Sequence, residues 1–164
     1  MACFHGTRQR INKYMIKGVN IKKLDKYCDE RGFLAELFRS DEDSYLPVMA
    51  YVSMTNPGIV RGPHEHVHQS DGFAFFGPGS FRLYLWDRRE GSETMGEKIE
   101  IEVGEDNPSF VIVPPGVVHG YKCISDKAAL SINLPNKLYK GENKGEEIDE
   151  VRWEEDKDSP YQII

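Results

Sequence analysis

The sequence predicts an all-β, single-domain barrel, and three observations lead to this prediction. Short runs of alternating apolar and polar residues recur along the chain, separated by Gly, Pro and Asp turns. The alternation is clearest over 98–103, where two isoleucines and a valine face one way and charged residues face the other. No convincing helical period occurs before residue 136. A length of 164 residues fits one domain with its own core.

Each expected strand begins and ends at turn-forming residues, such as Gly-Pro-Gly at 77–79. In chain order the expected strands are Met15–Leu24, Phe33–Arg39, Val48–Thr55, Phe73–Phe76, Ser80–Trp86, Lys98–Val103, Phe110–Val113, Val118–Ile124 and Ala128–Leu134. The strand at 80–86 carries bulky residues on both faces, so we expect one face inside the barrel and the other against a dimer partner. Residues 1–14 are expected to be an extension or leader. Residues 15–164 are expected to form the barrel domain, with an irregular acidic C-terminal segment.

The charge distribution excludes some partners. The formal net charge is −6, which gives no electrostatic reason to bind nucleic acid or an anionic membrane. Residues 1–24 hold six Lys or Arg and no acid, whereas 141–164 hold nine Asp or Glu. We expect two solvated tails, or a basic N-terminal stretch that pairs with an acidic surface of a partner subunit. Three scattered cysteines argue against a disulfide framework and fit a cytoplasmic protein.

The most informative stretch runs from Gly58 to Asp71 and contains His64, His66 and His68. On a strand, residues two apart point to the same face, so these imidazoles are expected to line one wall. Imidazole can ligate a metal, act as a general base or bind a substrate. We expect His64 to be functional, whereas His68 is expected to satisfy backbone groups.

A second stretch, 114–121, returns the chain through a Pro-Gly turn and presents His119 at the start of a strand. Glycine followed by five residues and His-x-His, and later Pro-x-Gly-x-x-His, together resemble the two motifs of the cupin superfamily. The resemblance implies a cupin-type double-stranded β-helix, the jelly-roll barrel. It places His64, His66 and His119 around one cavity.

Metal-binding cupins use two histidines, an acid a few residues later, and the histidine of the second motif. The resemblance therefore implies, as one alternative, a divalent transition metal held by His64, His66, Asp71 and His119. Asp71 stands where Glu is usual, and Cys123 stands where the second motif has Asn.

A narrower resemblance covers nearly the whole chain from Met15. It is to the dTDP-4-dehydrorhamnose 3,5-epimerase family, which uses the cupin barrel without a metal. The matching segments occur in order at 15–19, 29–36, 60–64, 79–87, 113–120, 125–128 and 152–153. This resemblance implies that the substrate is a nucleotide-linked 4-keto-6-deoxy sugar, that no cofactor is needed, and that the protein is a homodimer.

The resemblance also assigns roles to residues. The family histidine, here His64, removes a proton from the carbon beside the ketone, which requires a base of near-neutral pKa. Arg31 and Arg61 match arginines that bind the nucleotide phosphates or the sugar, since a planar guanidinium suits phosphate. Glu36 and His119 are likewise expected to contact the substrate.

This chain departs from the family at three positions. The family lysine beside the ketone falls near Gly72, and the family tyrosine falls near Ser131. The aspartate that supports the histidine falls beyond the end of this chain. Tyr121 or Tyr139 is expected to replace the family tyrosine as the catalytic acid, and Tyr121 is the stronger choice.

Three other functions stay open at this point. Sugar-nucleotide 3,4-ketoisomerases also carry Arg-Gly-x-His-x-His, a pattern that includes His66 as a second catalytic histidine. The chain is alternatively a metal-dependent cupin enzyme, or a sugar-binding cupin without catalysis. A homodimer formed partly by strands from the first forty residues is expected, because an unpaired strand edge favours association.

Overall fold

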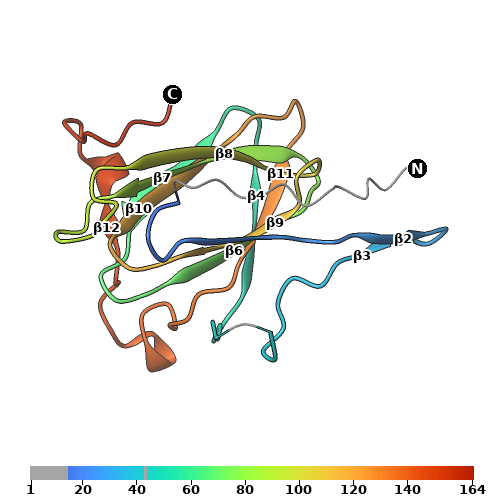
Figure 1. The fold of residues 1–164 in the computed structure, drawn as a ribbon, viewed down its shortest axis with the longest axis horizontal. Helices are drawn as coiled ribbons and strands as arrows, with labels where there is room; N and C mark the ends of the chain where they lie inside the picture. The colour runs from blue at the N-terminus through green and yellow to red at the C-terminus, as the bar shows by residue number, and fades with distance from the viewer. Residues whose placement is uncertain (1–14, 43) are drawn as a thin grey trace.

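The computed structural model describes residues 15–42 and 44–164, and these residues form two facing antiparallel sheets (Figure 1). The first sheet has the order β1 (Asn20–Lys23), β9 (Ser109–Val113), β6 (Asp71–Phe75), β11 (Ala129–Asn133), β4 (Tyr51–Thr55). The second has the order β12 (Val151–Arg152), β5 (Val60–Glu65), β10 (Val117–Cys123), β7 (Ser80–Asp87), β8 (Lys98–Gly104). This architecture confirms the all-β prediction. No helix among the described residues has the length and apolar character needed to span a bilayer.

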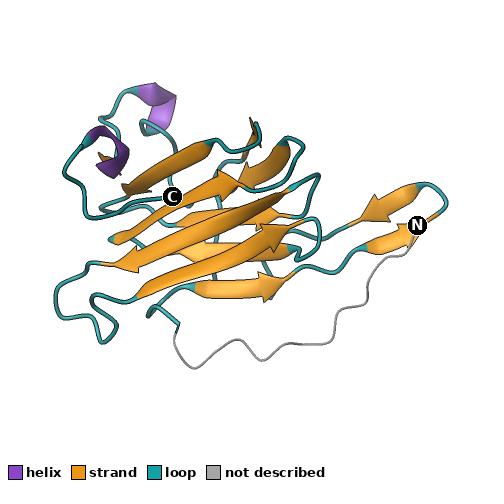
Figure 2. Cartoon of the chain, turned by 90° about the horizontal axis from the view of Figure 1, so that it is seen from above, coloured by secondary structure: helices purple, strands orange, loops and turns teal. Residues whose placement is uncertain are grey.

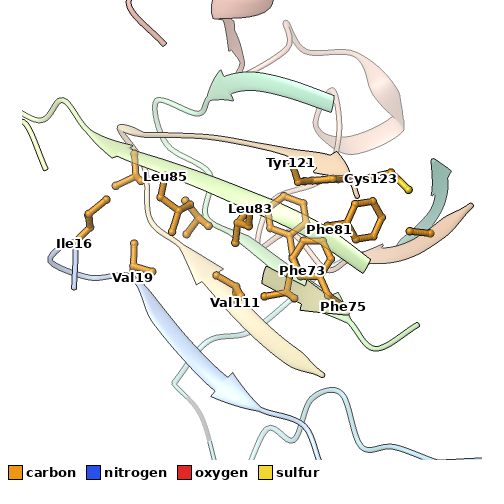
Figure 3. Packing of buried hydrophobic residues seen from close by; sticks show 14 residues of the cluster. Ile16, Val19, Phe73, Phe75, Phe81, Leu83, Leu85, Val111, Tyr121 and Cys123 are labelled. Carbon is orange, nitrogen blue, oxygen red and sulfur yellow. The ribbon is translucent and has the colours of Figure 1, made fainter. Parts of the chain in front are cut away.

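The core lies between the two sheets, because alternate residues of each strand point inward. Phe81, Leu83 and Leu85 of β7 are fully buried, as the period-two pattern predicts. They pack with inward residues of the first sheet, among them Phe73 and Phe75 of β6 (Figure 3). Aromatic pairs in such a cluster each stabilise a fold by about 0.5–1.5 kcal/mol beyond their buried area.

The outward face of β7 is covered by the C-terminal part of the same chain. Tyr84 and Trp86 pack against Trp153, Tyr161 and Ile163, and both β7 side chains are buried. The expectation that this face meets a dimer partner is therefore wrong. The sequence shows that both faces of the strand are bulky, but not what covers them.

The acidic C-terminal segment is not a solvated tail where it passes the histidines. After the 3₁₀ turn η1 (Glu142–Lys144), strand β12 pairs with β5, with Arg152 opposite His64. A second 3₁₀ turn, η2 (Trp153–Glu155), follows directly. The expectation of a solvated tail is wrong here. The pairing of β12 with β5 and the packing of Trp153, Tyr161 and Ile163 hold the segment on the barrel despite its acidic residues.

A two-stranded hairpin, β2 (Tyr27–Asp29) and β3 (Gly32–Leu34), projects from the barrel (Figure 2). The strand expected over 33–39 therefore ends early, and residues 35–39 are irregular. Cys28 in this hairpin is disulfide-bonded, so the expectation against disulfides from the scattered cysteines is wrong for this residue, whereas Cys123 is a buried free thiol. The basic N-terminal stretch lies mostly in residues 1–14, outside the described residues.

Candidate active site

Strand pairing brings the two histidine motifs together. In the register of β5 and β10, His64 lies opposite His119. The ring centroids of these two residues are 4.5 Å apart, and the ring of His66 lies 5.5 Å from His64 and 5.9 Å from His119. The predicted convergence of three imidazoles is therefore confirmed.

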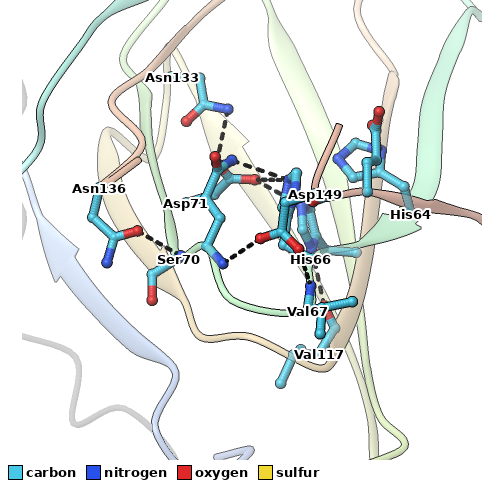
Figure 4. A network of polar contacts seen from close by, with 12 residues as sticks. His64, His66, Val67, Ser70, Asp71, Val117, Asn133, Asn136 and Asp149 are labelled. Carbon is cyan, nitrogen blue, oxygen red and sulfur yellow. Dashed lines mark hydrogen bonds and ion pairs between the residues drawn. The ribbon is translucent and has the colours of Figure 1, made fainter. Parts of the chain in front are cut away.

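A buried carboxylate links two of the three imidazoles. Asp71, the first residue of β6, is 1% exposed, and its Oδ2 lies 3.0 Å from His66 Nε2 and 3.2 Å from His119 Nε2 (Figure 4). Its Oδ1 accepts hydrogen bonds from Gln69 Nε2 at 3.0 Å and Asn133 Nδ2 at 3.2 Å. Four donors around one carboxylate compensate for removing its charge from water.

The outer nitrogens of these two imidazoles also face oxygen acceptors. His119 Nδ1 lies 3.0 Å from the carbonyl oxygen of Val117, and His66 Nδ1 contacts the carbonyl oxygen of Asp149. Carbonyl and carboxylate oxygens only accept hydrogen bonds, so each ring N–H that faces one of them is held by it. The two rings are fixed in orientation and have no nitrogen free to act on a ligand.

The pKa values of the cluster diverge for physical reasons. Burial lowers the pKa of His64 well below its ordinary value, and the neighbouring His119 and His66 lower it further. Burial also opposes charge on His66, but the hydrogen bond and charge of Asp71 outweigh it, so the pKa of His66 is raised. The hydrogen bonds from the two imidazoles likewise outweigh burial at Asp71 and lower its pKa. His64 is thus neutral in the pH range where His66 carries charge.

Glu150 lies beside His64, where the sequence predicted no carboxylate. Its Oε1 lies 3.6 Å from His64 Nδ1, and both side chains are largely buried. This separation is longer than a hydrogen bond, so the carboxylate acts on the ring by its charge. A negative charge on this side favours the tautomer with the proton on Nδ1, which leaves Nε2 free to accept a proton. Glu150, rather than the family aspartate, is the carboxylate beside His64 in this chain. The available signal was the place of Glu150 two residues before Arg152-Trp153, because those two residues already matched the family.

His64 and His66 open onto a cavity of about 770 Å³. His119, which was expected to contact the substrate, is 2% exposed and does not line this cavity. His64, His66 and His68 line one part of it, together with Glu150 and Arg152. The remaining wall comes from Val48 and Tyr51 and from the segment after β11, which contributes basic, acidic and apolar side chains, including Asn136, Lys137, Leu138, Tyr139, Lys140, Glu142, Glu146, Glu147 and Asp149. The volume falls in the range of small-molecule sites, and the wall combines aromatic, apolar and charged groups as such sites do.

Other expected site residues lie elsewhere. Tyr121 is 5% exposed in the core, and its Oη lies 3.1 Å from Ser131 Oγ, so it does not line the cavity. Arg31 is exposed on the projecting hairpin and pairs with Asp29. Glu36 is engaged with Arg39. The structure of one chain thus does not bring these residues to the histidines.

Arg61 also lies outside the cavity lining. Its Nε donates to Thr55 Oγ1 at 2.8 Å, and its Nη2 donates to the carbonyl oxygen of Met54 at 3.1 Å. These contacts attach β5 to β4 of the other sheet, across the rim of the barrel. The guanidinium of Arg61 therefore stabilises the contact between the two sheets, whether or not it also binds a ligand.

The same cluster has the composition of a metal site. One ligand atom from each of His64, His66, Asp71 and His119 lies within 4.8 Å of all the others. Three imidazoles and a carboxylate suit iron, manganese, nickel or zinc. The ring–carboxylate hydrogen bonds also account for this arrangement without an ion, because each Asp71 contact is of hydrogen-bond length.

Comparison with known proteins identifies the family. The sequence model of the dTDP-4-dehydrorhamnose 3,5-epimerase family matches residues 13–158. The chain belongs to this family. Its fold is accordingly the cupin jelly roll, and its relatives are sugar-nucleotide epimerases.

Two relatives of this epimerase family cover most of the chain. A probable low-salt glycan biosynthesis epimerase of Haloferax volcanii, Agl13, is 39% identical over 134 residues, which are 80% of this chain and 86% of that protein. The spore coat polysaccharide biosynthesis protein SpsL of Bacillus subtilis is 36% identical over 143 residues, 87% of this chain and 93% of that protein. Among solved structures, a dTDP sugar isomerase of Desulfovibrio desulfuricans has a TM-score of 0.78, 24% identity, and covers 90% of this chain and 91% of its own. That likeness concerns the fold.

Proposed function

We propose that this protein epimerises or isomerises a nucleotide-linked 4-keto-6-deoxy sugar, with His64 as the base. The observation that carries this proposal is a neutral imidazole on the wall of an open cavity, with Glu150 beside its Nδ1, kept unprotonated by burial and by its two neighbours. Proton removal beside a ketone needs such a base. Family membership supplies the substrate class.

The second histidine has a complementary role. Removing the proton creates an enolate, whose oxygen must be stabilised by a donor or positive charge. His66 has a raised pKa and lines the same cavity within 5.5 Å of His64, centroid to centroid. We infer that His66 stabilises the enolate through its charge, because both of its ring nitrogens are already hydrogen-bonded. In the ketoisomerase alternative it would have to release one of these contacts to return the proton to the neighbouring carbon.

Phosphate binding needs cations that this cavity provides only in part. Lys137 and Lys140 lie on its wall, whereas Arg31 and Glu36 lie away from it. We infer that the protein is a homodimer in which the projecting hairpin reaches a second copy. That arrangement would bring Arg31 and Glu36 to a partner's cavity. Arg61 would act on the substrate site indirectly, by holding β5 against β4 at the rim of the barrel.

Solvent exchange tests the proposal. Incubated in D₂O with dTDP-4-keto-6-deoxyglucose, the protein should introduce deuterium beside the ketone, as followed by NMR. Exchange at two carbons supports epimerisation, and exchange at one carbon with a migrating ketone supports ketoisomerisation. His64→Asn should lower exchange by about 10²–10⁴-fold without loss of fold, because the base is removed. Binding without any exchange in the wild-type protein would identify a sugar-binding cupin instead.

A metal-dependent enzyme is the second candidate, and the four-ligand cluster favours it. His64, His66, Asp71 and His119 would hold a divalent transition metal, which would supply Lewis-acid chemistry at a substrate oxygen when bound. Elemental analysis of the purified protein decides between the candidates. A stoichiometric metal that is lost in Asp71→Ala, together with the activity, would support this alternative.

A further inference from the structure

Inverting a carbon requires two groups on opposite sides of the sugar, and the second group is absent from its family position. By the resemblance the family lysine falls near Gly72, where a Cβ would come within 2.8 Å of ring atoms of Phe110 and Tyr45. The tyrosine position holds Ser131, which is buried and in contact with Tyr121. Neither position can present a proton to the cavity. A group facing His64 must therefore come from another strand.

Tyr51 occupies the required wall. It lies on β4 of the first sheet, whereas His64 lies on β5 of the second, and both side chains line the cavity. In the register of β4 and β11, Tyr51 stands opposite Asn133, so their side chains share one face of the sheet. Asn133 in turn contacts Asp71, which places this face toward the histidine cluster.

Hydrogen bonding leaves the proton of Tyr51 available. Asn133 Nδ2 lies 3.2 Å from Asp71 Oδ1 and 2.7 Å from Tyr51 Oη. A carboxylate only accepts, so the amide must present its nitrogen to Asp71, and the second amide proton is directed to the phenol oxygen. Tyr51 Oη therefore accepts one bond, and no acceptor for its own proton occurs among the described residues. Burial, aided by the charge of Asp71, raises the pKa of Tyr51 to about 12, so the phenol stays protonated at neutral pH.

The other candidate tyrosine on the wall is less well held. Tyr139 lies on the loop after β11, and its hydroxyl has no hydrogen-bond partner in the described part of the chain. Its ring contacts Lys140. A proton donor must be held in place to act on one carbon, and only Tyr51 has a strand and an anchored oxygen to do so.

We propose that Tyr51 delivers the proton to the sugar carbon from the side opposite His64. This proposal rests on the proposed epimerase function. His64 Nε2 takes the proton beside the ketone, and the C–H electron pair forms the enolate double bond while the ketone becomes an oxyanion. The ketone then re-forms, the double-bond pair takes the proton of Tyr51 on the opposite face, and a phenolate remains. Asn133 holds that phenolate until solvent in the open cavity restores its proton, and His64 releases the proton it took.

Tyr51→Phe separates this role from a structural one. With dTDP-4-keto-6-deoxyglucose in D₂O, His64 can still remove and return a proton on one face, so deuterium exchange should stay within about tenfold of the wild-type rate. Formation of the inverted sugar should fall by about 10²-fold or more, because the opposite-face donor is lost. His64→Asn should lose both. Tyr161→Phe makes the same chemical change away from the cavity and should alter neither.

Each other outcome is informative. If Tyr51→Phe inverts the sugar at the wild-type rate, Tyr51 is not the donor, although the epimerase function stands. If the variant binds dTDP normally by calorimetry and loses exchange and inversion together, Tyr51 acts on the first step and the proposed role is overturned. If the wild-type protein exchanges no proton at all, both the function and this role are overturned.

Discussion

The imidazoles of His64, His66 and His119 lie within 6 Å of one another, centroid to centroid, yet their environments differ. His66 and His119 each have oxygen acceptors at both nitrogens. His64 has Glu150 on one side and the cavity on the other. Two groups whose pKa values are pushed apart by their surroundings are suited to opposite roles in proton transfer. The base is the imidazole that the network leaves free.

The lowered pKa of His64 gives a pH prediction. A base acts in its neutral form, and burial with two neighbouring imidazoles keeps His64 neutral below its ordinary pKa. The exchange rate should therefore hold constant from neutral pH down past about 6.5 and fall only in more acidic solution. His66→Gln removes one neighbouring charge, so in this variant the exchange rate should begin to fall at a higher pH than in the wild-type protein. A wild-type exchange rate that already falls at or above about pH 6.5 would contradict this assignment.

Among the structural elements, the C-terminal segment contributes most to the site after the histidine strands. It adds β12 to the edge of β5, carries Glu150 to His64, and covers Tyr84 and Trp86 on the outside of the barrel. Asp149 attaches it at the site itself. Its carboxylate accepts hydrogen bonds from three consecutive backbone N–H groups, those of Val67, His68 and Gln69, at 2.7–3.1 Å.

Asp149→Ala should loosen this attachment. Three backbone donors would lose a charged acceptor, so we expect a loss of about 1–3 kcal/mol in the free energy of unfolding, measured in urea. Hydrogen exchange should accelerate at the amides of 67–69, and KM should rise as Glu150 is displaced. Asp158→Ala is the matched control, because that side chain is exposed and remote from the cavity.

The same interaction has a defined pH dependence. Burial opposes the charge of Asp149, but the backbone hydrogen bonds outweigh it and lower the pKa of the carboxyl. A group with a lowered folded pKa stabilises the protein above its unfolded pKa, and the effect is lost as the pH falls through the folded value. The stability difference between wild type and Asp149→Ala should therefore narrow below about pH 4. A difference that does not change with pH would show that the carboxylate charge is not responsible.

In the molecule as a whole, large apolar residues are exposed at two places that bear on association, the projecting hairpin and the edge strand β4. The hairpin exposes Phe33 and Leu34 at 52% and 62%, and the edge strand β4 exposes Val52 and Met54 at 62% and 53%. A free edge strand and a projecting apolar hairpin both favour association with another chain. They agree with the inferred homodimer, although the face of β7 expected to meet the partner is already covered.

Light scattering at high micromolar concentration should report a dimer. Leu34→Asp places a charge on the hairpin and should shift the protein toward the monomer, because burying an unpaired carboxylate in an interface is costly. Met95→Asp changes a residue of similar exposure, 58%, on a turn between β7 and β8, and should leave the dimer intact. A monomeric wild-type protein, or equal effects of both changes, would contradict the hairpin interface.

The sequence by itself determined the parts of this protein that depend on local order. Period-two alternation gave the barrel strands, and the two motif spacings gave His64, His66 and His119, because residues two apart on a strand share a face. The tertiary structure alone decided which groups surround them. Glu150 lies 86 positions from His64 along the chain, and Tyr51 meets Asn133 through strands 82 positions apart. No local pattern encodes such contacts, since they are set by strand register and by the path of the C-terminal segment.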